Sequence, residues 1–536
     1  MSGISWKSAQ TVGLLSQNVK NTLMPDRNFL LIIIGVAVFH VASLTYFPPV
    51  FVDEAWLVSR ASAWLNTGIN FGPLDAGVFD KKLEGYGTFY PIIPTLLLSV
   101  FIHWFGLTVN WLRFLPLLCG FGLLVATFSI ANQISFSRRS GLVAVLLVST
   151  SHSFLVSAHL IRYDIFVAAL GYGAIAVVIA GCRRHSSSLF LVAGLMMSLA
   201  FEVHVNAAIF GPIILTLMVA QCGWSILGSR QFGVFAFGVF IGLVTYLWMH
   251  VAQHPTTFFT MGKVFTLTHS PPILSASLIQ PWSFLRIMGG YWIYLTSGRI
   301  LITALAAVTL YRAKCENSKV LFLTLVFGLI AFSLLIRNRM FYYAILIGPL
   351  SDIFLAVWIH EISRKNVELG FWLKRAKAFG IATLIVTLAV PVFIVFSTPQ
   401  PGDLELIGTR VKRFVPSNAT IMGPPTYWFE LHGHPYLSWV QILAHRLFDS
   451  SSSIDTALDV LRPDFLIIDD DMRQYILSDR SEVPRSGFDR YIWDRRLTKE
   501  ELDSFLARRA ELVDSFVTPT YGAIQIYSIH WGHTTN

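Results

Sequence analysis

The chain alternates between long apolar runs and short polar segments. Most of the apolar runs are close to the length of about 20 residues that a helix needs to cross a bilayer. The pattern predicts membrane-spanning helices at 29–49, 110–134, 141–159, 165–182, 187–203, 206–224, 231–250, 287–311, 319–336, 341–360 and 378–397. We therefore expect about eleven spanning helices, with an uncertainty of one or two.

The polar segments between these helices fall into two alternating kinds. One kind is short and basic, as at Arg138-Arg139 and Arg183-Arg184. Basic segments favour the cytoplasmic side of a membrane, so residues 1–28 are expected to be cytoplasmic. The other kind carries acidic, histidine and tyrosine side chains and is expected to face outward.

One apolar run, 91–105, tests this orientation. It is short and contains Pro91 and Pro94. If it crossed the membrane, every later basic segment would lie outside. We therefore expect it to lie along the outer interface, within a first external loop at 48–109.

The last part of the chain has a different pattern. Residues 398–536 are rich in charge, and short β-like runs alternate with helix-like stretches. The β-like runs are 419–422, 465–468 and 523–529, and the helix-like stretches are 454–461 and 499–512. This alternation predicts a small α/β domain outside the membrane, following an α-helical membrane domain at 29–397.

Composition supports a multi-pass membrane protein, which we expect in the plasma (inner) membrane. Of the 536 residues, 54% are hydrophobic and 13% are charged, whereas soluble domains carry about 25% charged residues. The net charge of +9 comes largely from the short basic segments, so it does not indicate nucleic-acid binding. The four cysteines match neither a zinc pattern nor a disulfide framework.

The expected orientation gathers the unusual polar residues on the outer face. Asp53 and Glu54 follow the first helix. Adjacent carboxylates on a helical turn cannot point the same way, so we expect Asp53 to face a cavity and Glu54 to be more peripheral. Asp53 could act as a general base or hold a cation. The alternative is a solvated helix end, or an ion pair with Arg60.

Two further pairs lie on the same side. Arg162 and Asp164 share a short segment, where a purely structural pair is the alternative. Glu202 and His204 interrupt an apolar stretch, where a buried structural histidine is the alternative. Together with Asp53, these groups are typical of a site that handles an anion and a proton at the interface.

Arginines supply the candidate anion-binding groups. Arg339 lies close to Tyr342 and Tyr343, and guanidinium groups with phenols can hold a phosphate at a bilayer surface. The alternative is ordinary interfacial anchoring of a helix end. Arg299 falls within a predicted helix, where an arginine is costly unless it faces a polar cavity or the helix start is misplaced.

The order of several motifs resembles a known family. An acidic pair after the first helix is followed by FSRRSG (136–141), LIRYD (160–164), FEVHVNA (201–207) and RNRMFYY (337–343). This series resembles the GT-C fold glycosyltransferases that use polyprenyl-phosphate sugars, in the branch with protein O-mannosyltransferases and the aminoarabinose transferase of lipid A. The resemblance covers residues 30 to 360. VHVNA departs from the family's Lys-Gly-Pro type element.

The resemblance implies a reaction and a set of roles. A sugar would pass from a polyprenyl-phosphate donor to an acceptor hydroxyl on the extracytoplasmic face, with inversion of the anomeric centre. The acceptor could be a lipid, a polysaccharide or a protein, and use of a divalent cation such as Mg²⁺ or Mn²⁺ stays open. The resemblance implies that Asp53 is the base and that Glu54 supports it. It implies that Arg339, with Tyr342 or Tyr343, holds the phosphate, and that Arg299 is a second candidate for this role. Arg162 and Asp164 would lie at the acceptor side or hold a metal, and Glu202 and His204 would line the donor pocket.

Two other classes of protein share parts of this pattern. A secondary transporter or a flippase for lipid-linked saccharides would also have many helices and polar groups in the membrane, but near the midplane. A non-catalytic scaffold would require the grouping of Asp53, Arg162 and Arg339 to be a coincidence.

Overall fold

The structure is a computed structural model. It describes residues 27–76, 87–269, 303–304, 306–307, 316–336, 341–364, 385, 389, 392–398, 402–448, 453–470, 472–473 and 498–531. The predicted helices 287–311 and 378–397 lie mostly outside these ranges.

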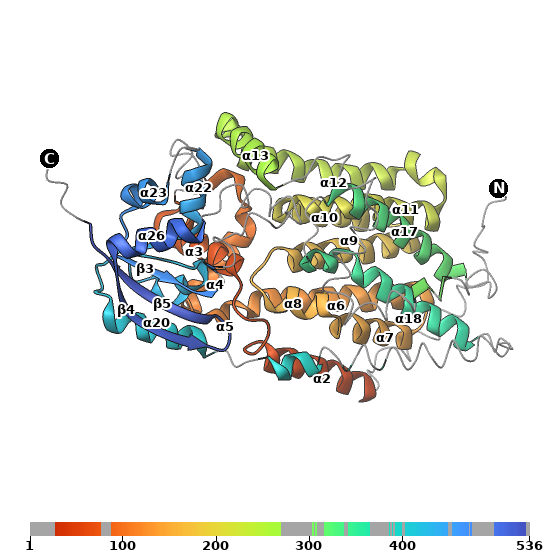
Figure 1. The fold of residues 1–536 in the computed structure, drawn as a ribbon. Helices are drawn as coiled ribbons and strands as arrows, with labels where there is room; N and C mark the ends of the chain where they lie inside the picture. The colour runs from red at the N-terminus through yellow and green to blue at the C-terminus, as the bar shows by residue number, and fades with distance from the viewer. Residues whose placement is uncertain are drawn as a thin grey trace.

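The described helices of the membrane domain form one elongated bundle (Figure 1). They are α2 (Arg27–Ser43), α6 (Phe114–Ser135), α7 (Arg138–Ser149), α8 (His152–His159), α9 (Asp164–Arg184), α10 (Ser187–Val203), α11 (Phe210–Cys222), α12 (Arg230–Tyr246), α13 (Pro255–His269), α17 (Glu316–Leu335) and α18 (Gly348–Arg364). Short helices η4 (Val205–Ile209), η5 (Trp224–Gly228), η6 (Leu247–Ala252) and η7 (Phe341–Leu346) connect or extend them.

Five described helices are long and apolar enough to cross a membrane, or six if one bent pair counts as a span. The chain is therefore an integral membrane protein, as its composition predicts. The shorter α2 and α10 are also apolar. Because two predicted helices lie largely outside the described residues, the count of about eleven stays a prediction.

The predicted span 141–159 contains a bend. It is two helices, α7 and α8, that meet at an angle of 68°. The polar run Thr150-Ser151 explains the break, because the Ser151 hydroxyl accepts a hydrogen bond from the backbone N–H of Phe154 at 3.1 Å and so caps a new helix. The bend directs α8 toward the first external loop.

Helices α10 and α12 approach each other closely through small residues. A Cβ atom added at Gly238 would lie 2.7 Å from the carbonyl oxygen of Leu191 and 3.0 Å from the backbone nitrogen of Leu195. Because both neighbours belong to the backbone of α10, the contact leaves no room for a side chain.

We expect Gly238→Ala to destabilise the protein by about 1–3 kcal/mol, because the added methyl group overpacks this contact. Thermal unfolding of the purified protein in detergent measures the effect. Gly233→Ala is the matched control on the same helix, since no atom lies within 4 Å of its added Cβ. Equal stability of the two variants would contradict the close packing.

The segment predicted as the first external loop, which keeps this name below, forms a compact layer of its own. Helix α3 (Val52–Thr67) packs against α4 (Ile92–Phe105), and η1 (Pro73–Asp75), η3 (Gly87–Phe89) and α5 (Val109–Leu112) complete the layer. With 14 residues, α4 is about 21 Å long, which is shorter than the apolar core of a bilayer, about 30 Å. Its position along the interface stays a prediction.

The C-terminal part forms an α/β domain around one sheet. The sheet has five strands in the order β2-β1-β3-β5-β4. The strands are β1 (Ile421–Gly423), β2 (Tyr436–Ser438), β3 (Phe465–Ile468), β4 (Ala510–Thr518) and β5 (Gly522–Ile529). Strands β2, β1 and β3 run parallel, and β5 pairs antiparallel with both β3 and β4.

Helices surround this sheet and carry it against the membrane domain. They are α20 (Asp403–Phe414), η8 (Pro425–Tyr427), α21 (Trp428–Leu431), α22 (Val440–Phe448), α23 (Ile454–Leu461) and α26 (Lys499–Arg509). The helix predicted at 499–512 extends three residues too far, because residues from Ala510 onward pair with β5. Strands β2 and β4 were not predicted.

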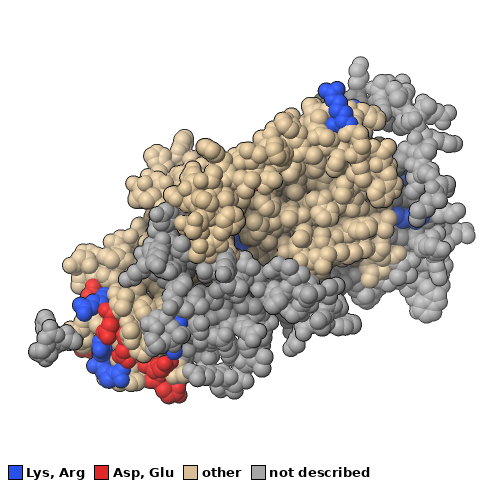
Figure 2. All heavy atoms as spheres, turned by 90° about the horizontal axis from the view of Figure 1, so that it is seen from above, with Lys and Arg blue, Asp and Glu red and all other residues tan. Residues whose placement is uncertain are grey.

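The first external loop lies between the bundle and the sheet (Figure 1). Helix α3 contacts η8, and η1 contacts β2. In Figure 2 the acidic side chains in view gather over the α/β end, whereas most of the described surface of the bundle carries no charge. The fold thus places the external loop at the boundary between an apolar bundle and a charged domain.

Candidate active site

Asp53 and Arg162 meet where α3 faces the segment between α8 and α9. The Arg162 guanidinium forms an ion pair with the Asp53 carboxylate, and its Nε donates to Oδ2 of Asp164 at 2.9 Å. The Asp53 side chain is 34% exposed, whereas Asp164 is buried. Asp53 is therefore the accessible carboxylate of this centre.

The side chains around Arg162 stabilise its positively charged form. Its guanidinium carbon lies 3.4 Å from the centre of the Tyr342 ring, in a cation–π contact. Burial lowers the pKa of Arg162, but Tyr342 and Asp164 raise this pKa by more, so the net shift is upward and the side chain stays charged. Arg162 thus brings together the acidic pair, the LIRYD segment and the RNRMFYY segment of the sequence.

Glu54 turns away from this centre into the protein. It is completely buried, and Arg113 donates to both of its oxygens, from Nε to Oε1 at 2.9 Å and from Nη2 to Oε2 at 2.7 Å. Its oxygens also accept the backbone N–H groups of Phe51 at 2.8 Å and Ile161 at 3.0 Å. Glu54 therefore lies away from the centre that contains Asp53, and it is buried inside the protein.

These contacts show how the chain positions Asp53. The bond from Phe51 satisfies a free N–H at the start of α3, as a capping carboxylate does. Ile161 directly precedes Arg162, so Glu54 links the helix that carries Asp53 to the segment that carries Arg162. Arg113 adds bonds to the carbonyl oxygens of Pro48 at 2.9 Å and Pro49 at 3.3 Å.

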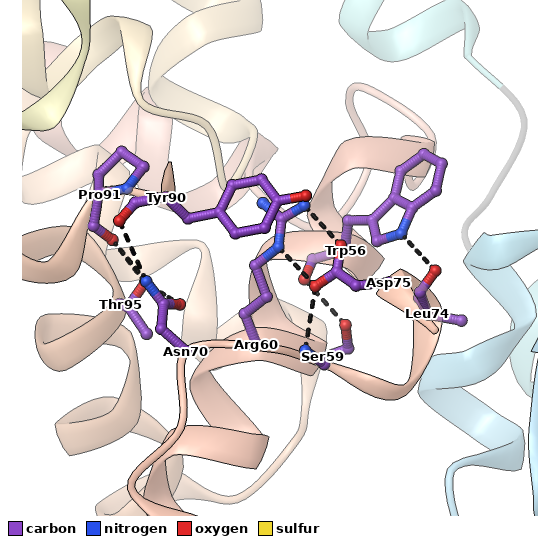
Figure 3. Close-up of polar contacts among 10 residues, drawn as sticks. Trp56, Ser59, Arg60, Asn70, Leu74, Asp75, Tyr90, Pro91 and Thr95 are labelled. Carbon is purple, nitrogen blue, oxygen red and sulfur yellow. Dashed lines mark hydrogen bonds and ion pairs between the residues drawn. The ribbon is translucent and has the colours of Figure 1, made fainter. Parts of the chain in front are cut away.

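A second buried ion pair holds the middle of α3 (Figure 3). Arg60 donates to Asp75 from Nε at 2.8 Å and from Nη2 at 2.7 Å, and its guanidinium lies 3.4 Å from the centre of the Tyr90 ring. The sequence-based alternative, in which Arg60 pairs with the Asp53-Glu54 pair, is therefore wrong for Glu54, whose cation is Arg113. Burial raises the pKa of the neighbouring Tyr163 to about 12, so this phenol stays protonated.

An aromatic wall lies next to Arg162. The ring centres of Tyr342 and Tyr343 are 4.8 Å apart, and that of Tyr343 lies 6.2 Å from His204. Burial lowers the pKa of His204, which is therefore a neutral imidazole at pH 7. The Nδ1 atom of His204 accepts the N–H of Asn206 at 3.1 Å, so the ring proton is on Nε2 and can be donated.

Glu202 has a structural contact that the sequence did not indicate. Its Oε1 accepts the first N–H groups of α4, from Ile92 at 2.7 Å and from Ile93 at 3.2 Å. A carboxylate at a helix N-terminus is stabilising. Glu202 therefore joins α10 to the external loop.

Two of the expected phosphate holders, Arg339 and Arg299, lie outside the described residues. Among the residues that the structure describes, no group of three or more His, Cys, Asp and Glu side chains could hold a metal ion. Metal use therefore stays open.

Sequence reasoning missed Arg113 and Asp75. Arg113 lies at the start of an apolar helix. A single arginine in such a place indicates a buried acidic or polar partner, and this signal could have identified it. Asp75 gave no comparable signal, because it lies in the short helix η1, 15 residues after its partner Arg60 in α3.

Comparison with known proteins shows which solved structures share this architecture. No protein-family model and no curated protein match the sequence. Among solved structures, ArnT from Cupriavidus metallidurans bound to undecaprenyl phosphate has a TM-score of 0.59 and 12% identity, and its apo form has 0.60 and 13%. Each alignment covers 93% of this chain and 97% of that chain.

An archaeal protein shares the fold more distantly. The Archaeoglobus fulgidus oligosaccharyltransferase tethered with an acceptor peptide has a TM-score of 0.51 and 13% identity, over 94% of this chain and 74% of that chain. These solved structures are glycosyltransferases of the GT-C class. The chain thus has the GT-C fold, and the fold expected from its motifs is confirmed.

Proposed function

We propose that this protein is a membrane glycosyltransferase that moves a sugar from a polyprenyl-phosphate donor to an acceptor hydroxyl on the extracytoplasmic face. The observation that carries the proposal is the centre formed by Asp53, Arg162 and Tyr342. It joins a partly exposed carboxylate to a buried cation at one end of an apolar bundle. The shared fold with ArnT, whose structure holds undecaprenyl phosphate, supports a lipid-linked donor.

The proposed reaction needs one base and one leaving group. Asp53 takes the proton of the acceptor hydroxyl, and the hydroxyl oxygen attacks the anomeric carbon of the sugar. The bond between that carbon and the phosphate oxygen breaks, and the polyprenyl phosphate leaves with the electron pair. Attack from the face opposite the phosphate inverts the anomeric centre.

Charge decides which residues can serve these roles. Glu54 is neutralised by Arg113, and Arg60 by Asp75. Among the residues that the structure describes, the centre is then left with Asp53, Asp164 and the guanidinium group of Arg162. Asp53 is the accessible carboxylate, Arg162 orients it through their ion pair, and Asp164 holds Arg162 in place.

The leaving phosphate needs positive charge beyond Arg162, which already faces two carboxylates. We therefore propose Arg339 as its main partner, because Tyr342 and Tyr343, only a few residues further on, line the centre. Arg299 is the second candidate. His204 and Glu202 border the donor side, where His204 donates from Nε2.

The orientation of the protein in the membrane can be tested separately. The described pairs Arg138-Arg139 and Arg183-Arg184 lie at the start of α7 and at the end of α9, away from the α/β domain (Figure 1). We therefore propose a cytoplasmic N-terminus and an extracytoplasmic domain at 398–536. In a variant without native cysteines, Asn418→Cys should react with an impermeant maleimide on intact cells. Arg184→Cys should react only after permeabilisation, and the reverse pattern would contradict the orientation. Both positions are exposed.

Activity is tested with the purified protein and a panel of polyprenyl-phosphate sugars, with the products identified by mass spectrometry. Transfer of sugar from one of these donors supports the proposal. Absence of transfer from every donor, together with flux of the lipid-linked sugar across proteoliposomes, would identify a flippase instead.

A further inference from the structure

Two adjoining cavities lie where the first external loop meets the α/β domain. Their volumes are about 620 and 410 Å³, and Leu107 and His432 line both. Pockets that bind small molecules measure about 300–1,000 Å³. We call these two cavities together the interdomain groove.

The groove lies close to the proposed base but outside the centre that contains it. Pro48, Pro49 and Val50 line the larger cavity, and Asp53 follows them by three residues. Arg113 lines the same cavity and binds Glu54. A ligand in the groove would therefore lie against the segment that carries Asp53.

Short hydroxyl and amide side chains line the groove. Those from the membrane domain are Thr45, Ser62, Asn66, Thr67, Thr108 and Asn110. His432 adds an imidazole whose Nδ1 lies 2.8 Å from the carbonyl oxygen of Phe429 and donates to it, so Nε2 can accept a hydrogen bond. Such directional groups match a ligand with many hydroxyl groups, whose partners must each be satisfied.

The charge of the larger cavity is acidic on balance. Asp403, Glu405 and Glu430 line it, together with Lys412 and Arg113. Arg113 is neutralised by Glu54, and Lys412 lies 3.9 Å from Glu430. Asp403 and Glu405 therefore make the electrostatic potential of the cavity negative, which favours a ligand that carries a protonated amino group.

An extended peptide fits the groove less well. Peptides commonly bind by adding a strand to a free sheet edge. The edge strand at the groove is β2, and η1 packs against it. This contact leaves recognition to side chains.

We propose that the interdomain groove binds a saccharide part of the acceptor, with a preference for amino sugar units. Calling this saccharide part of the acceptor rests on the proposed glycosyl transfer. The binding itself does not depend on catalysis, and it gives the α/β domain a role in acceptor selection.

Calorimetric titration of the full-length protein in detergent tests the groove directly. The probes are chitotetraose and its fully deacetylated form. We expect saturable binding of both and tighter binding of the deacetylated probe. His432→Ala should weaken binding roughly ten-fold, as expected for loss of one anchor in a pocket. Glu405→Gln should remove the preference for the deacetylated probe.

The α/β domain offers matched controls. His530 and Glu511 are exposed, with side-chain exposures of 63% and 74%, and neither lines the groove. His530→Ala and Glu511→Gln should therefore leave binding unchanged. Absence of saturable binding, or equal affinity of His432→Ala and wild type, would overturn the proposal. Binding of a serine-rich peptide that neither saccharide displaces would assign the groove to polypeptide instead. Saccharide binding without any transfer would leave the groove standing and remove only the proposed reaction.

Discussion

Asp53→Asn should abolish most sugar transfer while leaving the fold and donor binding intact. An amide cannot take the proton of the acceptor hydroxyl, and loss of a general base costs roughly 10²- to 10⁴-fold in rate. The side chain is 34% exposed, so little stability is expected to be lost with its charge. Single-turnover transfer from the donor found in the panel measures the rate, and thermal unfolding checks the fold.

The control for this variant is another partly exposed aspartate. Asp459 is 46% exposed and pairs with Arg509 at 2.5 Å in the α/β domain. Asp459→Asn should keep the wild-type rate. Unchanged transfer in Asp53→Asn would remove Asp53 from the mechanism, and loss of both folding and transfer would make its role structural.

Arg113→Met should be the most destabilising substitution proposed for this chain. It leaves Glu54, which is completely buried, without its cation and leaves the carbonyl oxygens of Pro48 and Pro49 without their donor. Removing one partner of a buried ion pair costs about 3–5 kcal/mol. Thermal unfolding in detergent measures the loss.

A double variant separates the lost charge pair from lost packing. Arg113→Met with Glu54→Gln should recover part of the stability, because the amide oxygen of the glutamine can still accept a backbone N–H and carries no charge. Arg508→Met is the surface control, since Arg508 is 55% exposed although it pairs with Asp455 at 2.7 Å. Surface pairs contribute about 0–1 kcal/mol. If Arg113→Met were no less stable than Arg508→Met, Glu54 could not be held as described.

Much of the fold could be predicted from local patterns. The spans 165–182 and 187–203 agree closely with α9 and α10, because a continuous apolar run of that length has few other stable conformations. Strand β3 was predicted at its observed bounds. Strand β4 was missed because its first residues continue a helix-like pattern, and only pairing with β5 makes them a strand.

The sequence predicted several residues of the candidate site, but it did not predict how they are arranged. The motifs indicated Asp53, Arg162 and Tyr342 as candidates, and in the structure Arg162 contacts both of the others. The partners of Glu54 and Arg60 could not be predicted, because they lie 59 and 15 residues away and no local rule connects them.

The amino-acid sequence alone determined that the protein crosses a membrane many times and that a charged α/β segment follows. These features depend on apolar length and on the distribution of charge, which are local properties of the chain. Only the tertiary structure showed which cation neutralises the second of the two adjacent carboxylates. Asp53 remains at the surface of the centre because α3 is turned so that Arg113, 59 residues away in the sequence, binds and neutralises the buried Glu54.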